Sequence, residues 1–324
     1  MKDSYGRTIE YMRISVTDRC NMRCRYCIPD GCEKLPMSAI LTYEEIVRIC
    51  SVAADLGIRK IKITGGEPFV RRGCTSLIRS IKSLDGIDEV TVTTNGQNLD
   101  EYIDELKDIG IDGINISLDT LDPERFGYIT GGGTLDRTLR SVDIAAESGI
   151  RTKINCVLLK GFNDDEITAL AEMAFEKGVD VRFIELMPIG AGDPEEGVSN
   201  EFVLGKLMEK WPDLEPDESI HGNGPAIYYR RPGIAGSIGF ISAIHGKFCS
   251  SCNRIRLTSQ GQIKPCLCYE DGTDLRPYLS GSDDELRVAI EKAILEKPAG
   301  HCFASEAVYA GSNNETRLMS QIGG

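Results

Sequence analysis

The sequence predicts an α/β protein, an open, partial barrel of six βα units followed by a smaller C-terminal α+β domain. Three observations support this prediction. Short apolar segments alternate with segments of helical periodicity, a glycine and a β-branched residue precede most of the apolar segments, and these glycines recur at intervals of 24 to 39 residues, at Gly57, Gly86, Gly110, Gly149 and Gly178. A glycine suits the left-handed position that ends a helix, and the interval matches the size of a βα unit.

Six parallel strands are expected, at Tyr11–Val16, Lys60–Thr64, Val90–Thr94, Gly113–Ser117, Arg151–Val157 and Asp180–Ile184. Helices are expected between them. Thr42 and Glu45 form a capping-box signature, and apolar residues with i, i+3, i+4, i+7 spacing follow it and recur from Ile167 to Ala174. A closed barrel of this type needs eight units, so six units predict an open barrel. A doubly wound sheet is the competing architecture.

The βα pattern stops after Glu185, and the glycine-rich and acidic segment 190–197 resembles a linker. Beyond it the sequence predicts a helix at Glu201–Lys210, short strands near Ile227–Arg230, Ser237–Ile241 and Ile255–Thr258, and a helix at Asp283–Leu295. We therefore expect residues 1–198 to form the barrel and residues 199–324 to form the second domain.

The composition restricts the class of protein. The chain has 324 residues, 41% of them hydrophobic, and a net charge of −13, which argues against a nucleic-acid-binding role because such proteins need a basic surface. No apolar run reaches the roughly 18 residues of a membrane helix, and the start, Met1–Arg7, is polar. A soluble cytoplasmic protein without a membrane partner is therefore expected.

Twelve cysteines then need an explanation, because disulfides are rare in the reducing cytosol. Cys20, Cys24 and Cys27 form a CxxxCxxC motif directly after the first strand, on the face where barrels carry active sites. Three thiolates can hold a four-iron cluster whose fourth iron stays open for another ligand. Structural zinc needs four protein ligands, and no fourth Cys or His lies at a customary spacing.

A second cysteine group consists of Cys249, Cys252 and Cys266. Cys268 is a candidate fourth ligand, so the spacing of this group leaves zinc and an iron–sulfur cluster equally open. Most of the remaining cysteines are expected to be buried small apolar residues; these are Cys32, Cys50, Cys74, Cys156 and Cys302.

These motifs carry a resemblance. The CxxxCxxC motif with Tyr26 before its last cysteine resembles the radical S-adenosylmethionine (SAM) superfamily, and Thr64–Pro68 resembles that superfamily's SAM-binding GGEP element. The match is closer to the MoaA family, the GTP 3′,8-cyclases of molybdenum-cofactor biosynthesis. It rests on Arg13–Asn21, Ser117–Asp119, Arg182–Glu185, Cys249–Arg256 and the terminal Gly323-Gly324. The resemblance extends over essentially the whole chain.

The resemblance implies a lyase with two [4Fe-4S] clusters, the first on Cys20, Cys24 and Cys27 and the second on Cys249, Cys252 and Cys266. It implies that SAM yields a 5′-deoxyadenosyl radical, which removes the 3′ hydrogen of GTP so that the ribose carbon attacks C8 of guanine and gives 3′,8-cyclo-7,8-dihydro-GTP. It also implies that four residues contact SAM, namely Tyr26, Gly66, Ser117 and Met187. The terminal Gly323 and Gly324 would reach into the barrel as part of the catalytic site.

GTP requires basic residues near the site, because its triphosphate carries several negative charges in an acidic protein. The candidate ligands are Arg13, Lys62, Thr93, Lys153, Arg254 and Arg256. The first four lie on four different strands, where alternation can turn side chains inward. The family is expected to have Arg where this chain has Lys62. The lysine keeps the positive charge but lacks the guanidinium group that can bind a phosphate through two hydrogen bonds.

The resemblance further implies an electron donor of the flavodoxin or ferredoxin type, a downstream cyclic pyranopterin monophosphate synthase, and a homodimer. Two alternatives remain open from the sequence. One is another radical SAM enzyme with an auxiliary cluster, such as a peptide-modifying maturase. The other is a zinc-stabilised nucleotide-binding scaffold without redox chemistry, which an iron, sulfide and zinc count would distinguish.

Overall fold

One curved sheet runs through the part of the chain that the computed structural model describes, which is residues 1–324 without 29–33, 194–195, 247, 302, 304–314 and 324. Its strands are β1 (Tyr11–Ser15), β2 (Lys60–Thr64), β3 (Glu89–Thr94), β4 (Gly113–Ser117), β5 (Thr152–Val157), β6 (Asp180–Ile184), β7 (Glu215–Asp217), β8 (Ile227–Arg230), β9 (Ser237–Ile241), β10 (Arg254–Leu257), β11 (Gln262–Lys264) and β12 (Thr273–Asp274). The helices are α1 (Tyr43–Asp55), α2 (Cys74–Lys82), α3 (Ile103–Ile109), α4 (Pro123–Thr130), α5 (Leu135–Glu147), α6 (Ile167–Lys177), α7 (Asn200–Lys210), α8 (Asp283–Leu295) and α9 (Met319–Ile322).

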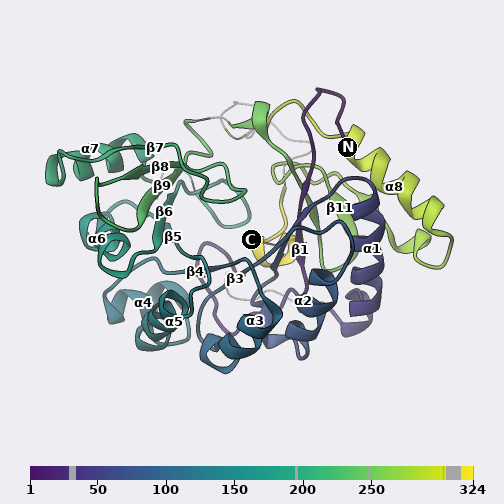
Figure 1. Ribbon diagram of the computed structural model, residues 1–324, viewed down its shortest axis with the longest axis horizontal. Coiled ribbons are helices and arrows are strands. Elements are labelled where there is room, and N and C mark those ends of the chain that lie inside the picture. Colours follow the sequence, from purple (N-terminus) through teal and green to yellow (C-terminus); the bar gives the residue numbers. More distant parts are fainter. Residues whose placement is uncertain (29–33, 194–195, 247, 302, 304–314, 324) are drawn as a thin grey trace.

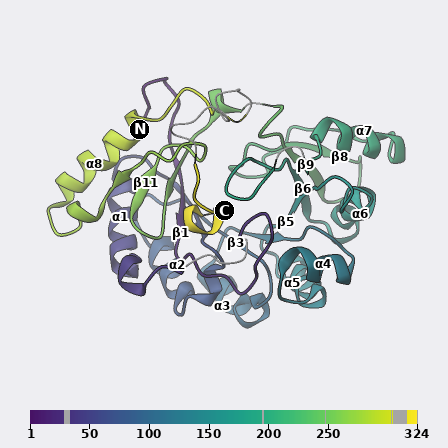
Figure 2. The same ribbon diagram turned by 180° about the vertical axis from the view of Figure 1, so that it is seen from behind.

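The first six strands lie side by side in sequence order, all parallel. Figure 1 shows α1 to α6 on the outer side of the curved sheet, while the yellow segment that carries α9 lies within the curve, as the reverse view in Figure 2 also shows. The six-unit open barrel is confirmed. The doubly wound alternative is wrong, because such a sheet reverses its strand order at a switch point and this one does not.

Strands from the C-terminal part of the chain extend the barrel at both edges. β10 pairs in parallel with β1, and β9 pairs in parallel with β6. The edge strands of an open barrel would otherwise present unpaired backbone groups, and these two additions satisfy them. The predicted α+β character of this region is confirmed by α7, α8 and the antiparallel pairs β7–β8, β8–β9, β10–β11 and β11–β12. The boundary between residues 198 and 199 stays a prediction.

Local sequence explains the barrel helices. In α1 the side chain of Thr42 accepts a hydrogen bond from the backbone of Glu45, whose carboxylate accepts one from the backbone of Thr42, so the predicted capping box is present. The helix turns Ile46, Ile49, Cys50 and Ala53 into the core. Gly110 and Gly178 end α3 and α6 with φ of 73° and 64°, the left-handed backbone that glycine tolerates best.

The cysteines outside the two groups are placed as predicted where they are described. Cys50, Cys74 and Cys156 are buried in the core, whereas Cys32 and Cys302 lie outside the described residues. Among the described helices, none combines the length and apolar character needed to span a membrane.

Candidate active site

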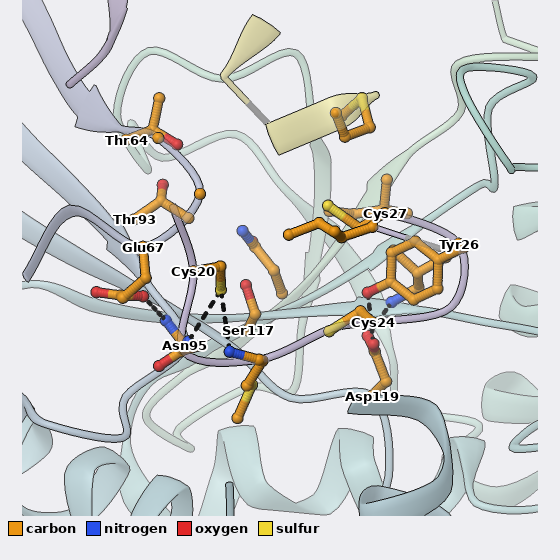
Figure 3. Close-up of a pocket in the computed structure, with 18 of the residues that line it drawn as sticks. Cys20, Cys24, Tyr26, Cys27, Thr64, Glu67, Thr93, Asn95, Ser117 and Asp119 are labelled. Carbon is orange, nitrogen blue, oxygen red and sulfur yellow. Dashed lines mark hydrogen bonds between the residues drawn. The ribbon is translucent and has the colours of Figure 1, made fainter. Parts of the chain in front are cut away.

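A cavity of about 230 Å³ lies at the carboxyl ends of the barrel strands. The CxxxCxxC residues Cys20, Cys24 and Cys27 line it, and Figure 3 shows their side chains facing the same space as Ser117. All four residues predicted to contact SAM also line this cavity, namely Tyr26, Gly66, Ser117 and Met187. The structure therefore brings the predicted cluster ligands and the predicted SAM contacts together.

Tyr26 is held by a carboxylate from the end of β4. Its hydroxyl donates to Asp119 Oδ2 at 2.6 Å, and Asp119 Oδ1 accepts the backbone N–H of Val157 at 2.8 Å (Figure 3). Burial raises the pKa of Asp119 to about 6, although both hydrogen bonds oppose that shift. Asp119 belongs to a motif that the sequence singled out, but its bond to Tyr26 depends on two loops meeting and had no sequence signal.

Cys20 receives two hydrogen bonds, from the backbone of Met22 at 3.4 Å and from Asn95 Nδ2 at 3.7 Å. Asn95 is itself fixed by Glu67 of the GGEP segment, whose Oε2 accepts the Asn95 N–H at 2.7 Å (Figure 3). Burial raises the pKa of Glu67 to about 7. Sequence analysis did not name Asn95 and named Glu67 only as part of the GGEP element, although Thr93-Thr94 at the end of β3 and the following Asn95-Gly96 form a recognisable signal.

Close backbone packing explains why the second glycine of the GGEP segment, Gly66, has no side chain. A Cβ at Gly66 would lie 2.3 Å from the carbonyl oxygen of Arg19 and 2.9 Å from that of Asp18. The segment can therefore pass close to the chain leading into the CxxxCxxC loop only without a side chain. This contact fixes the GGEP backbone beside the cysteines.

The thiol chemistry fits an iron–sulfur cluster. Burial raises the pKa of Cys20 to about 11 and that of Cys24 well above its usual range, so thiolates here require the positive charge of a metal. Cys20, Cys24 and Cys27 line one cavity, and a four-iron cluster takes each thiolate on a different iron, so this arrangement suits such a cluster.

The predicted GTP ligands divide between two places. Arg13, Thr93 and Arg256 line the strand-end cavity, whereas Lys62 and Lys153 line a smaller cavity of about 30 Å³ toward the amino ends of the strands. Arg254 lies 5.0 Å from the ring of Phe248, beside the second cysteine group. Strand position accounts for Lys153, the second residue of β5, but it does not separate Lys62 from Arg13, which are paired in register on β2 and β1.

Lys153 already has partners in that smaller cavity. Its ammonium lies 2.8 Å from Asp180 Oδ2 and donates to the Tyr228 hydroxyl at 2.9 Å. Burial lowers the pKa of Lys153 to about 8, which the Asp180 charge partly offsets. The Asp180 carboxylate thus compensates the charge of Lys153 within the protein.

Arg182 on β6 was missed as a basic residue of the barrel interior. Its Nη2 donates to Asn115 Oδ1 at 2.6 Å and to Asn155 Oδ1 at 2.5 Å, and its Nε is buried without a hydrogen-bond partner in the described residues. Burial lowers the pKa of Lys62, and the Arg182 and Arg13 charges lower it further. Cations that repel one another in a buried space call for an anion. Inward alternation on β6 could have identified Arg182.

The second cysteine group also assembles. Cys249 and Cys252 lie on and beside a turn of 3-10 helix at Cys249–Ser251, and their thiols interact electrostatically with Cys266. Burial pushes the pKa of Cys252 upward, but the charges of Arg254 and Lys297 and hydrogen bonds from Arg254 bring it down to about 7. The Cys268 side chain is buried, and its N–H donates to the Cys266 thiol.

The C-terminal tail reaches the same cavity. After α9, Gly323 has a φ of 82° and its carbonyl accepts a hydrogen bond from Arg256. A Cβ at Gly323 would lie 3.1 Å from the Ser15 Cβ and 3.3 Å from the Thr64 Cγ2, so this place suits glycine. Gly324 lies outside the described residues.

Comparisons with known proteins agree with this geometry. Residues 14–174 match the Radical SAM superfamily, and residues 179–303 match Molybdenum Cofactor Synthesis C. The chain is 43% identical to a GTP 3′,8-cyclase of Clostridium perfringens strain SM101 and 43% identical to one of Heliobacterium modesticaldum, in each case over the whole of both chains.

Solved structures show the same fold. Streptococcus suis SuiB superposes with a TM-score of 0.64 at 18% identity, over 89% of this chain and 67% of SuiB. SuiB bound to S-adenosylmethionine gives 0.62 at 17% identity, over 91% and 73% of the two chains. The full-length identity to the cyclases decides against the maturase and zinc-scaffold alternatives. The chain belongs to the GTP 3′,8-cyclase family of radical SAM enzymes.

Proposed function

We propose that the strand-end cavity is the site at which this chain converts GTP to 3′,8-cyclo-7,8-dihydro-GTP, the first step of molybdenum-cofactor biosynthesis. The observation that carries the proposal is that one cavity is lined both by the three cysteines of the CxxxCxxC motif and by Arg13 and Arg256. Thiols for a redox cluster and cations for a polyanion then line the same cavity. The C-terminal tail joins them, because the Gly323 carbonyl accepts a hydrogen bond from Arg256.

Cys20, Cys24 and Cys27 would hold the first [4Fe-4S] cluster, and Cys249, Cys252 and Cys266 would hold the second. When bound, the first cluster and SAM supply the 5′-deoxyadenosyl radical that removes the 3′ hydrogen from GTP. The chain's own contribution is to place the reacting groups and exclude water. Cys268 stays outside the proposed ligand set.

SAM would lie between the cysteine loop and the strand ends. Asp119 accepts a hydrogen bond from the Tyr26 hydroxyl, and this would orient Tyr26 so that the Tyr26 backbone can face the adenine. Gly66 offers backbone groups on a segment held against Arg19, which suits the methionine amino group. Ser117 ends β4 and Met187 follows β6, and both line the same cavity.

GTP would extend inward from the strand-end cavity. Thr93, Arg13 and Arg256 would meet it near the reacting ribose, and Arg254 would contact it beside the second cysteine group. Lys62 and Lys153 lie lower in the barrel with Arg182, where they would meet the far end of the triphosphate. Lys62 would act as a point charge rather than as a bidentate fork.

The remaining proposals concern the chain's surroundings. The two domains would divide at residues 198 and 199, the barrel carrying SAM and the C-terminal part carrying the second cluster and the tail. The electron donor would be a flavodoxin or ferredoxin, the product would pass to cyclic pyranopterin monophosphate synthase, and the chain would form a homodimer. A cytoplasmic location would suit the proposed clusters, because a reducing compartment keeps cysteines as thiols.

The test is anaerobic turnover of the iron-reconstituted protein with GTP, SAM and a reductant. Equal amounts of 5′-deoxyadenosine and cyclised GTP are expected, together with about eight irons per chain. Cys24→Ala should yield neither product, and Cys50→Ala, which alters a cysteine buried in the core on α1 and outside the cavity lining, should behave as the unaltered protein. Retained 5′-deoxyadenosine formation by Cys24→Ala would refute the assignment.

A further inference from the structure

A buried lysine links the two chain segments that carry the second cysteine group. Lys297 follows the end of α8 and is 3% exposed. Its ammonium donates to the carbonyl of Arg254 at 2.8 Å and to that of Pro265 at 2.6 Å. Arg254 lies two residues after Cys252, and Pro265 immediately precedes Cys266. Lys297 therefore sets the separation of these two segments.

The segment that presents Lys297 is itself fixed by the amino-terminal arm. The Arg7 guanidinium donates to the carbonyls of Pro298 at 2.7 Å and Ala299 at 3.1 Å, and to that of Cys249 at 2.8 Å. Arg7 is held by a buried ion pair with Asp3 at 2.6 Å. The turn carrying Cys249 and the segment carrying Lys297 are thus joined through one side chain.

The charge of Lys297 has no carboxylate among its hydrogen-bond partners in the described residues, since both are neutral carbonyls. An isolated buried ammonium is costly unless negative charge lies near it. Its electrostatic influence falls on the thiols of Cys252 and Cys266. Thiolates at these positions would supply the compensating charge, so the lysine and the cysteines form one electrostatic unit.

We propose that Lys297 is a positioning residue of the second cluster, which fixes the spacing of Cys252 and Cys266 and stabilises the more negative, reduced form of the cluster. The inference rests on the proposed function, in which these cysteines hold that cluster. Net charge and hydrogen bonding around a cluster set its reduction potential. Removing a buried positive charge makes reduction harder and moves the potential in the negative direction.

The experiment measures the midpoint potentials of both clusters, by electron paramagnetic resonance titration of the full-length reconstituted protein, and its iron content. Lys297→Gln removes the charge but keeps a hydrogen-bond donor, and Lys297→Arg keeps the charge. Lys292→Gln is the matched control, because it removes the same charge from an exposed position on α8, where Lys292 pairs with Glu296. The first cluster is an internal control in every sample.

Lys297→Gln is expected to shift the second cluster to a more negative potential, or to lower the iron content from about eight toward about four per chain, with the first cluster unchanged. Lys297→Arg should stay closer to the unaltered protein, and Lys292→Gln should match it. Three results would overturn the inference: an unchanged second potential in Lys297→Gln, an equal shift in Lys292→Gln or Lys297→Arg, or equal loss of both clusters. An unaltered protein with only one cluster would instead refute the proposed function.

Discussion

Arg256 Nη1 donates a hydrogen bond of 2.5 Å to the carbonyl oxygen of Gly323. The bond ties the last described residue of the chain to β10, the strand that pairs with β1 through Arg256 and Arg13. Both arginines line the cavity of the CxxxCxxC cysteines. The tail is therefore held at the proposed reaction site, whereas chain ends are often frayed.

Deleting Gly323 and Gly324 should leave SAM cleavage intact and stop cyclisation. The deletion removes no cluster ligand, but it removes the segment that fills the space beside Ser15 and Thr64. Positioning errors of about 1 Å can cost on the order of 100-fold in rate. Anaerobic turnover that follows 5′-deoxyadenosine and cyclised GTP separately checks this. Cyclisation at the full rate by the truncated chain would show that the tail is dispensable.

Replacing Arg256 with alanine should weaken GTP binding more than SAM binding. The substitution removes a cation that lines the cavity and also releases the Gly323 carbonyl. Hydrogen bonds to charged groups contribute roughly 1.5–3 kcal/mol, so the affinity for GTP should fall at least about tenfold. Equilibrium binding of each ligand to the reconstituted protein measures the two effects. Equal loss of both affinities would indicate local misfolding instead.

Cys266→Ala and Cys268→Ala should differ. Cys266 belongs to the second cysteine group, and its loss should remove about four of about eight irons while the first cluster still cleaves SAM. Cys268 is 1% exposed and uses its backbone N–H to support Cys266, so Cys268→Ala should keep all the iron. Iron and sulfide analysis decides between them. Equal iron loss in both variants would mean a four-cysteine site.

Asp119→Asn should change the pH dependence of stability. Burial raises the pKa of Asp119 from 3.8 to about 6 in the folded chain. The folded state therefore holds this proton more tightly than the unfolded state, and stability is lost as pH rises from about 4 to about 6. The difference between the two pKa values corresponds to a change in the free energy of unfolding on the order of 3 kcal/mol. An asparagine side chain at this position is neutral at every pH. Its oxygen can accept the Val157 N–H, and its NH₂ can donate to the Tyr26 hydroxyl, which then acts as the acceptor.

Urea unfolding of the metal-free protein at several pH values measures this effect. The free energy of unfolding of the unaltered chain should fall relative to that of Asp119→Asn across the window from pH 4 to pH 6. Parallel pH profiles for the two proteins would contradict the raised pKa of Asp119. The same variant should bind SAM, because Tyr26 keeps its partner.

The sequence predicted the bounds of helices and strands better than it predicted which strands pair. Alternating apolar residues and the residues that end helices are local, so β2, β4, β6 and α8 were predicted with their observed bounds. β9 and β10 were expected near their observed positions, but their pairing with β6 and β1 joins residues far apart in the chain. No local pattern encodes such pairing.

In the candidate site, too, the sequence predicted residues that belong to motifs but not the contacts between segments far apart in the chain. The cysteines and Gly66 carry motifs and were identified as site residues. Glu67 and Asp119 also lie in motifs, but their roles depend on contacts with Asn95 and Tyr26 in other loops. Inward alternation identified Lys153 as a cation of the barrel, but not that Asp180 lies 2.8 Å from it. Lys297 has no motif at all, since its place follows from the end of α8 and the carbonyls that it meets.

Deuterium transfer from GTP labelled at C3′ tests the central claim most directly. The reconstituted protein would be incubated anaerobically with the labelled GTP, SAM and a reductant, and both products would be analysed by mass spectrometry. The account predicts one deuterium in 5′-deoxyadenosine for each molecule of 3′,8-cyclo-7,8-dihydro-GTP formed. Unlabelled 5′-deoxyadenosine, with GTP recovered unchanged, would contradict it.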